Sequence, residues 1–162
     1  MGSQSNVFIS HYGEDDSSLQ SLRQRLKKAG HDIRNSSIDS TKHYNQERPS
    51  DAVVERLLRA RIHWAGTFIC LIGEKTHTRP WVDYEIKQAH LKGKQIIGIY
   101  KHGCTNSVEL PDNFKRYGGP TLGSNSLDKL SDVISGKTTP LEKPDGTQNE
   151  SLFTVKRIIC KR

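Results

Sequence analysis

The chain has 162 residues, of which 33% are hydrophobic, and it carries 25 Lys and Arg against 18 Asp and Glu. This length suits one domain with a single core, and the sequence contains no run of 18 apolar residues that could span a membrane. The formal net charge of +7 is spread along the chain, since residues 1–50 carry 7 cationic and 6 anionic side chains and residues 101–162 carry 10 and 7. Such a diffuse surplus of positive charge argues against a dedicated nucleic-acid site.

The N-terminal part predicts a strand followed by a helix. The run Asn6–Tyr12 is rich in β-branched and aromatic residues, which favours a strand. Leu19, Leu22 and Leu26 then recur at helical spacing, and Gly30 is placed to end the helix.

A second strand and helix are predicted next. Residues 31–39 are a weaker strand candidate, and a polar connection fills residues 40–49. The helix that follows has a predicted apolar face made of Val53, Val54, Leu57, Leu58 and Ile62. Residues 66–73 form a nearly continuous apolar run between two glycines, which predicts a strand buried on both faces at the centre of the sheet.

The pattern continues through the third helix and fourth strand and then weakens. Pro80 suits the first turn of a helix that runs to Gly93, and residues 94–100 read as another buried strand. Beyond residue 101 the chain is loop-rich, with a short fifth strand predicted near Pro120–Gly123 and a helix at Ser126–Ser135.

The C-terminal residues differ in composition. The segment 136–150 is low in apolar residues and predicts a flexible linker. Residues 151–162 alternate apolar and basic side chains, which suits an edge strand or a surface that docks a partner. We therefore divide the chain into a domain at 1–135 and a linker with a basic and apolar tail at 136–162.

Strands that alternate with helices through short connections predict an α/β, flavodoxin-like three-layer sandwich with a central parallel sheet of about five strands. In a sheet of order 2-1-3-4-5, ligands bind beyond the carboxyl ends of the first and third strands. The loops at residues 10–15 and 73–79 should therefore border the site. Glu85 and Trp81 lie four residues apart on the next helix, so they should share the face that points to this crevice.

Four segments carry a family resemblance: "VFISHYGED", "SSID", "TFICLIG" and "RPWVDYEI". In order and spacing they resemble the successive boxes of Toll/interleukin-1 receptor (TIR) domains, most closely the TIR-like ThsB proteins of the bacterial Thoeris antiphage system. The resemblance covers residues 6–135, which is more than a single motif could match.

The resemblance implies an enzyme of the NAD glycohydrolase or ADP-ribosyl cyclase type. It would cleave the nicotinamide–ribose bond of NAD and release an ADP-ribose-type messenger, cyclic or not, that activates a downstream effector protein. Glu85 matches the catalytic glutamate, and a carboxylate can stabilise the oxocarbenium-like ribose of such a reaction. The resemblance also assigns substrate contacts, more weakly, to Ser10, His11, Tyr12, Asp39 and Trp81.

NAD is the expected substrate, and no cofactor or metal is expected. The histidines lack metal-ligand spacing, and no glycine-rich phosphate loop occurs, so strand-end loops and side chains would have to hold the dinucleotide.

The residues alone leave other readings open. Glu85 suits an ordinary charge near a helix start, Trp81 suits a core position, and Asp39 suits a turn. The protein could then be a non-catalytic scaffold that self-associates through the 40–50 segment or the tail, or a nucleoside N-glycosidic enzyme.

Cysteine usage bears on the compartment. Cys70, Cys104 and Cys160 are odd in number and form no C-x-x-C pair, and no secretory leader follows Met1. We expect a soluble protein of a reducing cytoplasm.

Overall fold

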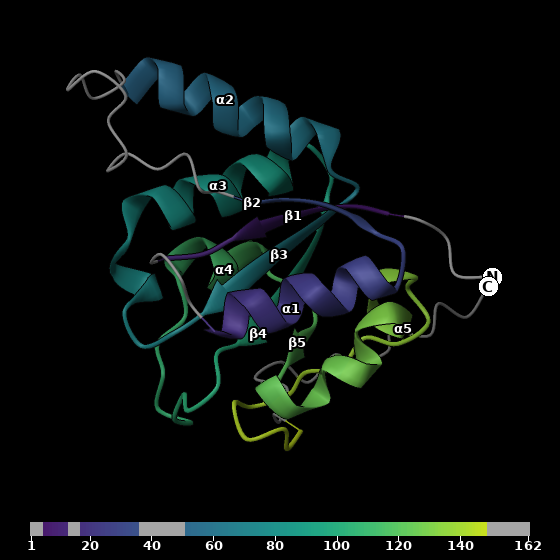
Figure 1. Ribbon diagram of the computed structural model, residues 1–162. Helices are drawn as coiled ribbons and strands as arrows, with labels where there is room; N and C mark the ends of the chain where they lie inside the picture. Colours follow the sequence, from purple (N-terminus) through teal and green to yellow (C-terminus); the bar gives the residue numbers. More distant parts are fainter. Residues whose placement is uncertain (1–4, 13–16, 36–50, 149–162) are drawn as a thin grey trace, which may run out of the picture.

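The computed structural model describes residues 5–12, 17–35 and 51–148 (Figure 1). The strands are β1 (Asn6–Ser10), β2 (Asp32–Asn35), β3 (Thr67–Ile72), β4 (Gln95–Tyr100) and β5 (Thr121–Leu122). The helices are α1 (Ser17–Lys28), α2 (Asp51–Trp64), α3 (Pro80–Leu91), α4 (Asp112–Tyr117) and α5 (Leu130–Ile134), with short 3-10 helices η2 (Thr76–Thr78) and η3 (Ser124–Lys129).

The sheet confirms the predicted flavodoxin-like arrangement. All strand pairs are parallel, and the strand order is β2-β1-β3-β4-β5. Ser10 at the end of β1 lies opposite Cys70 of β3, which in turn lies opposite Gly98 of β4. The order reverses between β1 and β3, which is where this fold places its ligand crevice.

Helices cover both faces of the sheet and enclose two apolar cores (Figure 1). One core lies under α2, α3 and α4, where Phe8 and Phe68 stack with ring centroids 5.5 Å apart. The other lies under α1 and α5, where Leu19, Leu22 and Leu26 are buried as predicted. Gly30 follows α1 with a φ of 86°, a conformation that glycine adopts without steric cost.

The predicted apolar face of α2 is only half correct. Val54, Leu58 and Ile62 are buried, whereas Val53 and Leu57 are 42% and 44% exposed. At 100° per residue the five positions span roughly 180° of the helix, and the sheet and α3 cover only the half that carries Val54, Leu58 and Ile62.

The elements after β4 include one that the sequence did not predict. The short fifth strand is present as β5, and the predicted helix at 126–135 is divided into η3 and α5, with Ser126 outside helical geometry. The loop-rich region contains α4, which has six residues and is too short for a periodic signal.

Contacts with β4 and with α3 hold α4 in place. Phe114 packs over Gly98, where a Cβ atom would lie 2.6 Å from Phe114 Cζ. The backbone N–H of Asn113 donates a 2.8 Å hydrogen bond to Asp83 Oδ1 on α3. The glycine in β4 therefore makes room for a ring that arrives from a separate helix.

The described part of the predicted linker, residues 136–148, packs against β5 and η3. Leu141 pairs with Thr121, and Glu142 is fully buried. The Glu142 carboxylate accepts hydrogen bonds from the Gly123 N–H at 3.1 Å and from Lys129 Nζ at 2.9 Å. The prediction of a flexible linker rested on the low apolar content of this segment. The segment is instead held by a buried carboxylate with hydrogen-bond partners, which a count of apolar residues does not reveal. The tail at 149–162 lies outside the described residues, and the boundary at residue 135 stays a prediction.

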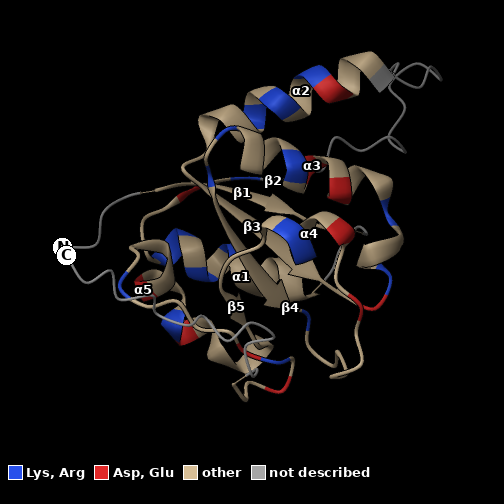
Figure 2. Ribbon diagram, turned by 180° about the vertical axis from the view of Figure 1, so that it is seen from behind, with Lys and Arg blue, Asp and Glu red and all other residues tan. Residues whose placement is uncertain are grey.

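Acidic and basic residues are interspersed along α2, α3 and α4, as the colours of the ribbon in Figure 2 show from behind the view of Figure 1. Among the described residues, none of the helices combines the length and apolar character needed to cross a bilayer.

Candidate active site

Glu85 lies on the inner face of α3. Pro80 begins this helix, and its buried positions are Val82, Glu85, Ile86 and Ala89. Glu85 is only 3% exposed, so its carboxyl group is buried on a helix face whose other buried side chains are apolar. The side chain therefore points toward the sheet, which the interpretation as a solvated helix charge does not explain.

Two sheet residues flank the carboxylate. Ser10 is the buried last residue of β1; burial raises the pKa of Glu85, and the Ser10 hydroxyl opposes this rise as a hydrogen-bond donor would. Ser10 Oγ and Glu85 Oε2 are nevertheless both shielded without a partner at full hydrogen-bond geometry, so we treat them as close polar neighbours. Such orphaned buried oxygens are costly to keep in a core and are typical of functional sites.

Burial raises the pKa of Glu85 from 4.5 to about 8, and the Ser10 hydroxyl and the positive charge of Arg61 oppose this shift only in part. At pH 7 roughly one molecule in ten would carry the ionised form. Burial, and next the Glu85 charge, raise the pKa of the Cys70 thiol far above its ordinary range. Cys70 therefore stays a neutral thiol and is no candidate nucleophile.

Two arginines that the sequence analysis did not single out lie here, Arg61 close to Glu85 and Arg34 close to Arg61. Arg61 of α2 has a lowered pKa because of burial and the nearby positive charge of Arg34, while Glu85 acts in the opposite direction. Arg34 of β2 places its guanidinium 4.3 Å from the ring centre of Trp64. A signal existed in the sequence, because Arg61 follows Leu58 by three residues and so lies beside the buried face of α2.

The loops at the carboxyl ends of β1, β3 and β4 meet around Tyr12. The guanidinium of Arg79, which precedes α3, lies 3.6 Å from the centre of the Tyr12 ring. Lys101, after β4, donates a 3.1 Å hydrogen bond from Nζ to the Tyr12 carbonyl oxygen. The structure thus brings together the two loops that the topology predicted, with Arg79 at the end of one of them, and it adds Lys101.

The other predicted site residues differ in how they are placed. His11 is half-buried and Tyr12 is 39% exposed at the end of β1. Trp81 is half-buried, packs against the core under α2 and α3, and meets Tyr84 edge to face at 5.7 Å. Its packing fits the core reading, and its contact with substrate stays a prediction. Asp39 lies outside the described residues.

Access to Glu85 requires movement. With an exposed fraction of 3%, the carboxylate can meet a sugar only after neighbouring groups shift. Two cavities lie on the opposite face of the sheet, and Glu85 lines neither of them, so they give no access to its carboxyl group. Among the described residues, no group of three or more His, Cys, Asp or Glu is arranged to hold a metal ion.

Sequence comparisons identify related proteins. The family described as "Thoeris protein ThsB, TIR-like domain" matches residues 8–106. The "Putative cyclic ADP-D-ribose synthase ThsB1" of Bacillus cereus (strain MSX-D12) is 34% identical over 63 residues, which is 39% of this chain and 33% of that protein. The match therefore spans about a third of the length of that curated relative.

Solved structures share the fold at low sequence identity. A 2-deoxyribosyltransferase from Bacillus psychrosaccharolyticus superposes with a TM-score of 0.56 at 14% identity, over 76% of this chain and 90% of that one. A conserved protein from Enterococcus faecalis V583 gives a TM-score of 0.50 at 13% identity, over 81% and 77% of the two chains. These similarities concern the fold alone.

Proposed function

The chain belongs to the ThsB TIR-like domain family, and we propose that it is an NAD-consuming enzyme of bacterial antiphage defence. It would act in the cytoplasm, cleave the nicotinamide–ribose bond and produce an ADP-ribose-type messenger, cyclic or not, that activates an effector protein. The Bacillus cereus relative, which is named "Putative cyclic ADP-D-ribose synthase ThsB1", supports this reaction class.

The observation that carries the proposal is the buried carboxylate of Glu85 beside Ser10 at the switch point of the sheet. When the bond between C1′ and the ring nitrogen breaks, the electron pair leaves with nicotinamide, which departs neutral. The ribose is left with an oxocarbenium-like positive charge. A carboxylate held in a water-poor site stabilises that charge more strongly than water would. Water or a nucleophilic atom of the substrate itself then attacks C1′.

The raised pKa of Glu85 also fits a cationic substrate. The nicotinamide ring of NAD carries a positive charge, and an opposite charge brought next to a carboxyl group favours its ionised form. Substrate binding would therefore help to generate the carboxylate that the reaction needs. Without substrate the carboxyl group of Glu85 stays mostly protonated at pH 7, because burial raises its pKa more than Ser10 and Arg61 lower it.

The strand-end loops suit the rest of a dinucleotide. Arg79 and Lys101 both contact Tyr12, so two positive charges lie near the crevice where a diphosphate would pass. We assign Ser10, His11 and Tyr12 to substrate binding at the end of β1 and keep Trp81 and Asp39 as further proposed contacts. Because Glu85 is covered, turnover would be low until a conformational change opens the site.

The test compares NAD turnover by the wild-type protein with that of Glu85→Gln, following nicotinamide release by mass spectrometry at high protein concentration. Glu109→Gln is the matched control, because its carboxyl group is exposed and paired with Lys115 at the surface. We expect loss of turnover in Glu85→Gln alone. Equal turnover in all three proteins would remove Glu85 from the mechanism.

A scaffold function has one observation in its favour, because α2 exposes Val53 and Leu57 on its outer face. Size measured against concentration, together with a persistent lack of turnover, would support self-association as the function. Nucleoside N-glycosidic activity is the third candidate. The similarity to a 2-deoxyribosyltransferase shows a shared fold and does not by itself support that activity. Release of free bases from a panel of nucleosides would distinguish it.

A further inference from the structure

A groove runs between α1 and the η3–α5 segment, on the face of the sheet opposite Glu85. It consists of two cavities of about 370 and 520 Å³. Both have Ser21 and Leu127 in their linings, so they meet at this pair of residues. The smaller cavity is within the size range of small-molecule sites.

The smaller cavity, here called the hydroxyl cavity, combines an apolar floor with hydroxyl groups. Side chains of Leu22, Leu71, Ile99 and Leu127 provide the floor. Hydroxyl groups come from Ser17, Ser18, Ser21 and Ser124.

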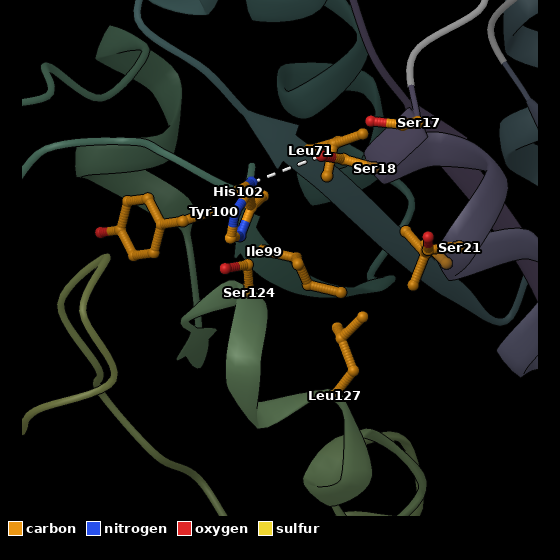
Figure 3. A pocket seen from close by; sticks show the side chains of 10 residues that line it. Ser17, Ser18, Ser21, Leu71, Ile99, Tyr100, His102, Ser124 and Leu127 are labelled. Atoms are coloured by element: carbon orange, nitrogen blue, oxygen red, sulfur yellow. Dashed lines mark hydrogen bonds between the residues drawn. The ribbon is translucent and has the colours of Figure 1, made fainter.

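Figure 3 shows how the side chains of the hydroxyl cavity lie. Ser21 from α1 and Leu127 from η3 face the space between these elements, and the ring of Tyr100 is turned away from it. His102 contributes an imidazole, and its backbone N–H donates a 3.3 Å hydrogen bond to Ser18 Oγ. The described residues that line this cavity include no Lys, Arg, Asp or Glu, and they can donate and accept hydrogen bonds.

The larger cavity, here called the basic cavity, continues along α1. Arg25 and Lys28 stand on its α1 side, and Asp128 stands on the η3 side. Two cations one helical turn apart, beside a single carboxylate, leave a local positive excess along α1.

We propose that this groove binds a nucleoside 5′-monophosphate. The flat base would lie on the leucine and isoleucine floor of the hydroxyl cavity, and the ribose hydroxyls would bond to the serines. The phosphate would extend past Ser21 to Arg25 and Lys28 in the basic cavity. A planar base, a neutral polar sugar and an anion, in this order, match the apolar floor, the serine hydroxyls and the basic cavity.

The proposed site is independent of the Glu85 crevice. Its walls come from α1, η3, α5 and the face of β3 and β4 that carries Leu71 and Ile99, whereas Glu85 faces the core under α2 and α3 on the other face. Binding in the groove therefore neither requires nor tests turnover of NAD, and loss of the one proposal leaves the other standing.

Isothermal titration calorimetry of the full chain with adenosine 5′-monophosphate tests the site. Ser21→Trp would fill the junction of the two cavities from an exposed helix position, so the fold should persist by circular dichroism. Gln20→Trp is the matched control, because residue 20 is exposed on the same helix and lines neither cavity. We expect affinity to fall by roughly tenfold or more in Ser21→Trp and to stay within about twofold in Gln20→Trp.

The position of the phosphate has its own test. Arg25→Ala and Lys28→Ala should each weaken the monophosphate about two- to fivefold, as loss of an exposed ionic contact does, and leave adenosine unaffected. Lys27→Ala is the control, since residue 27 lies between them in sequence but lines neither cavity. Absence of binding at millimolar ligand, or equal effects in the test and control variants, would overturn the proposal.

Discussion

Replacement of Glu85 by glutamine should stabilise the protein in a pH-dependent way. The amide has nearly the same shape as the carboxyl group but carries no charge, so it avoids the cost of burying an anion. Glu85 is only 3% exposed, and the burial of its carboxyl group is the main cause of its raised pKa. The two proteins should therefore be equally stable in acid, where both side chains are neutral.

The size of the effect follows from the two pKa values. The folded protein holds the Glu85 proton up to about pH 8, whereas the unfolded chain releases it near 4.5. Between these values the folded state binds more protons, so wild-type stability decreases as the pH rises. A difference of about 3.5 units corresponds to roughly 5 kcal/mol above pH 8 and to about 3 kcal/mol at pH 7. Glu85→Gln escapes this loss.

Urea unfolding of both proteins at pH 5, 7 and 9 measures the difference directly. Glu109→Gln serves again as the exposed control, and it should change the unfolding free energy by less than about 0.5 kcal/mol at each pH. A difference between wild type and Glu85→Gln that is the same at all three pH values would refute the reasoning. A carboxylate that weakens the fold at neutral pH is the trade-off expected of a site kept for function.

Three more measurements follow from the same structure. The value of kcat/KM for NAD should rise about tenfold per pH unit up to about pH 8 and then level off, because it reports the ionisation of Glu85 in the free protein. A flat pH profile would exclude Glu85 from the reaction. Gly98→Ala should lower the unfolding free energy by about 1 to 3 kcal/mol in urea, because the new methyl group would overlap Phe114, and an unchanged midpoint would contradict this packing. Burial acts to raise the pKa of Glu142, but hydrogen bonds from Ser126, Lys129 and the Gly123 N–H outweigh it and hold the pKa below 4.5. Glu142→Gln should therefore lower the free energy of unfolding in urea at pH 7 by about 1 to 3 kcal/mol. This deficit should vanish as the pH falls through the pKa of Glu142 in the folded protein. A deficit that persists in strong acid would argue against the charged bond to Lys129.

Local patterns were sufficient for the central elements of the fold. The apolar run of β3, the leucine spacing of α1 and Pro80 at the start of α3 each predict an element correctly, because every local preference agrees with the final structure. Parallel strands require crossover connections, so alternation of the two element types was enough to predict a parallel sheet with helices on both faces, and the expected flavodoxin-like order is the one observed.

Contacts between distant segments were not available to such reasoning. The α4 helix is too short to show periodicity and depends on Gly98 and Asp83, which come from other elements. The 140–148 segment looked like a linker because its anchor is a single buried carboxylate. For the candidate site, the topology predicted which loops approach each other, but the contact of Arg79 with Tyr12, the hydrogen bond from Lys101 and the charge of Arg61 near Glu85 depend on the tertiary structure.

The sequence by itself determined the alternation of strands and helices and the helix that carries Glu85. These follow from spacing along the chain, since side-chain direction within a helix or strand repeats with a fixed period. The flavodoxin-like strand order was an expectation from the fold class, and the structure confirmed it. Only the tertiary structure decided that Glu85 is buried beside Ser10 and that half of the apolar face of α2 is exposed. Burial and pKa depend on what other segments place around a side chain, and the period of a single helix carries no record of those neighbours.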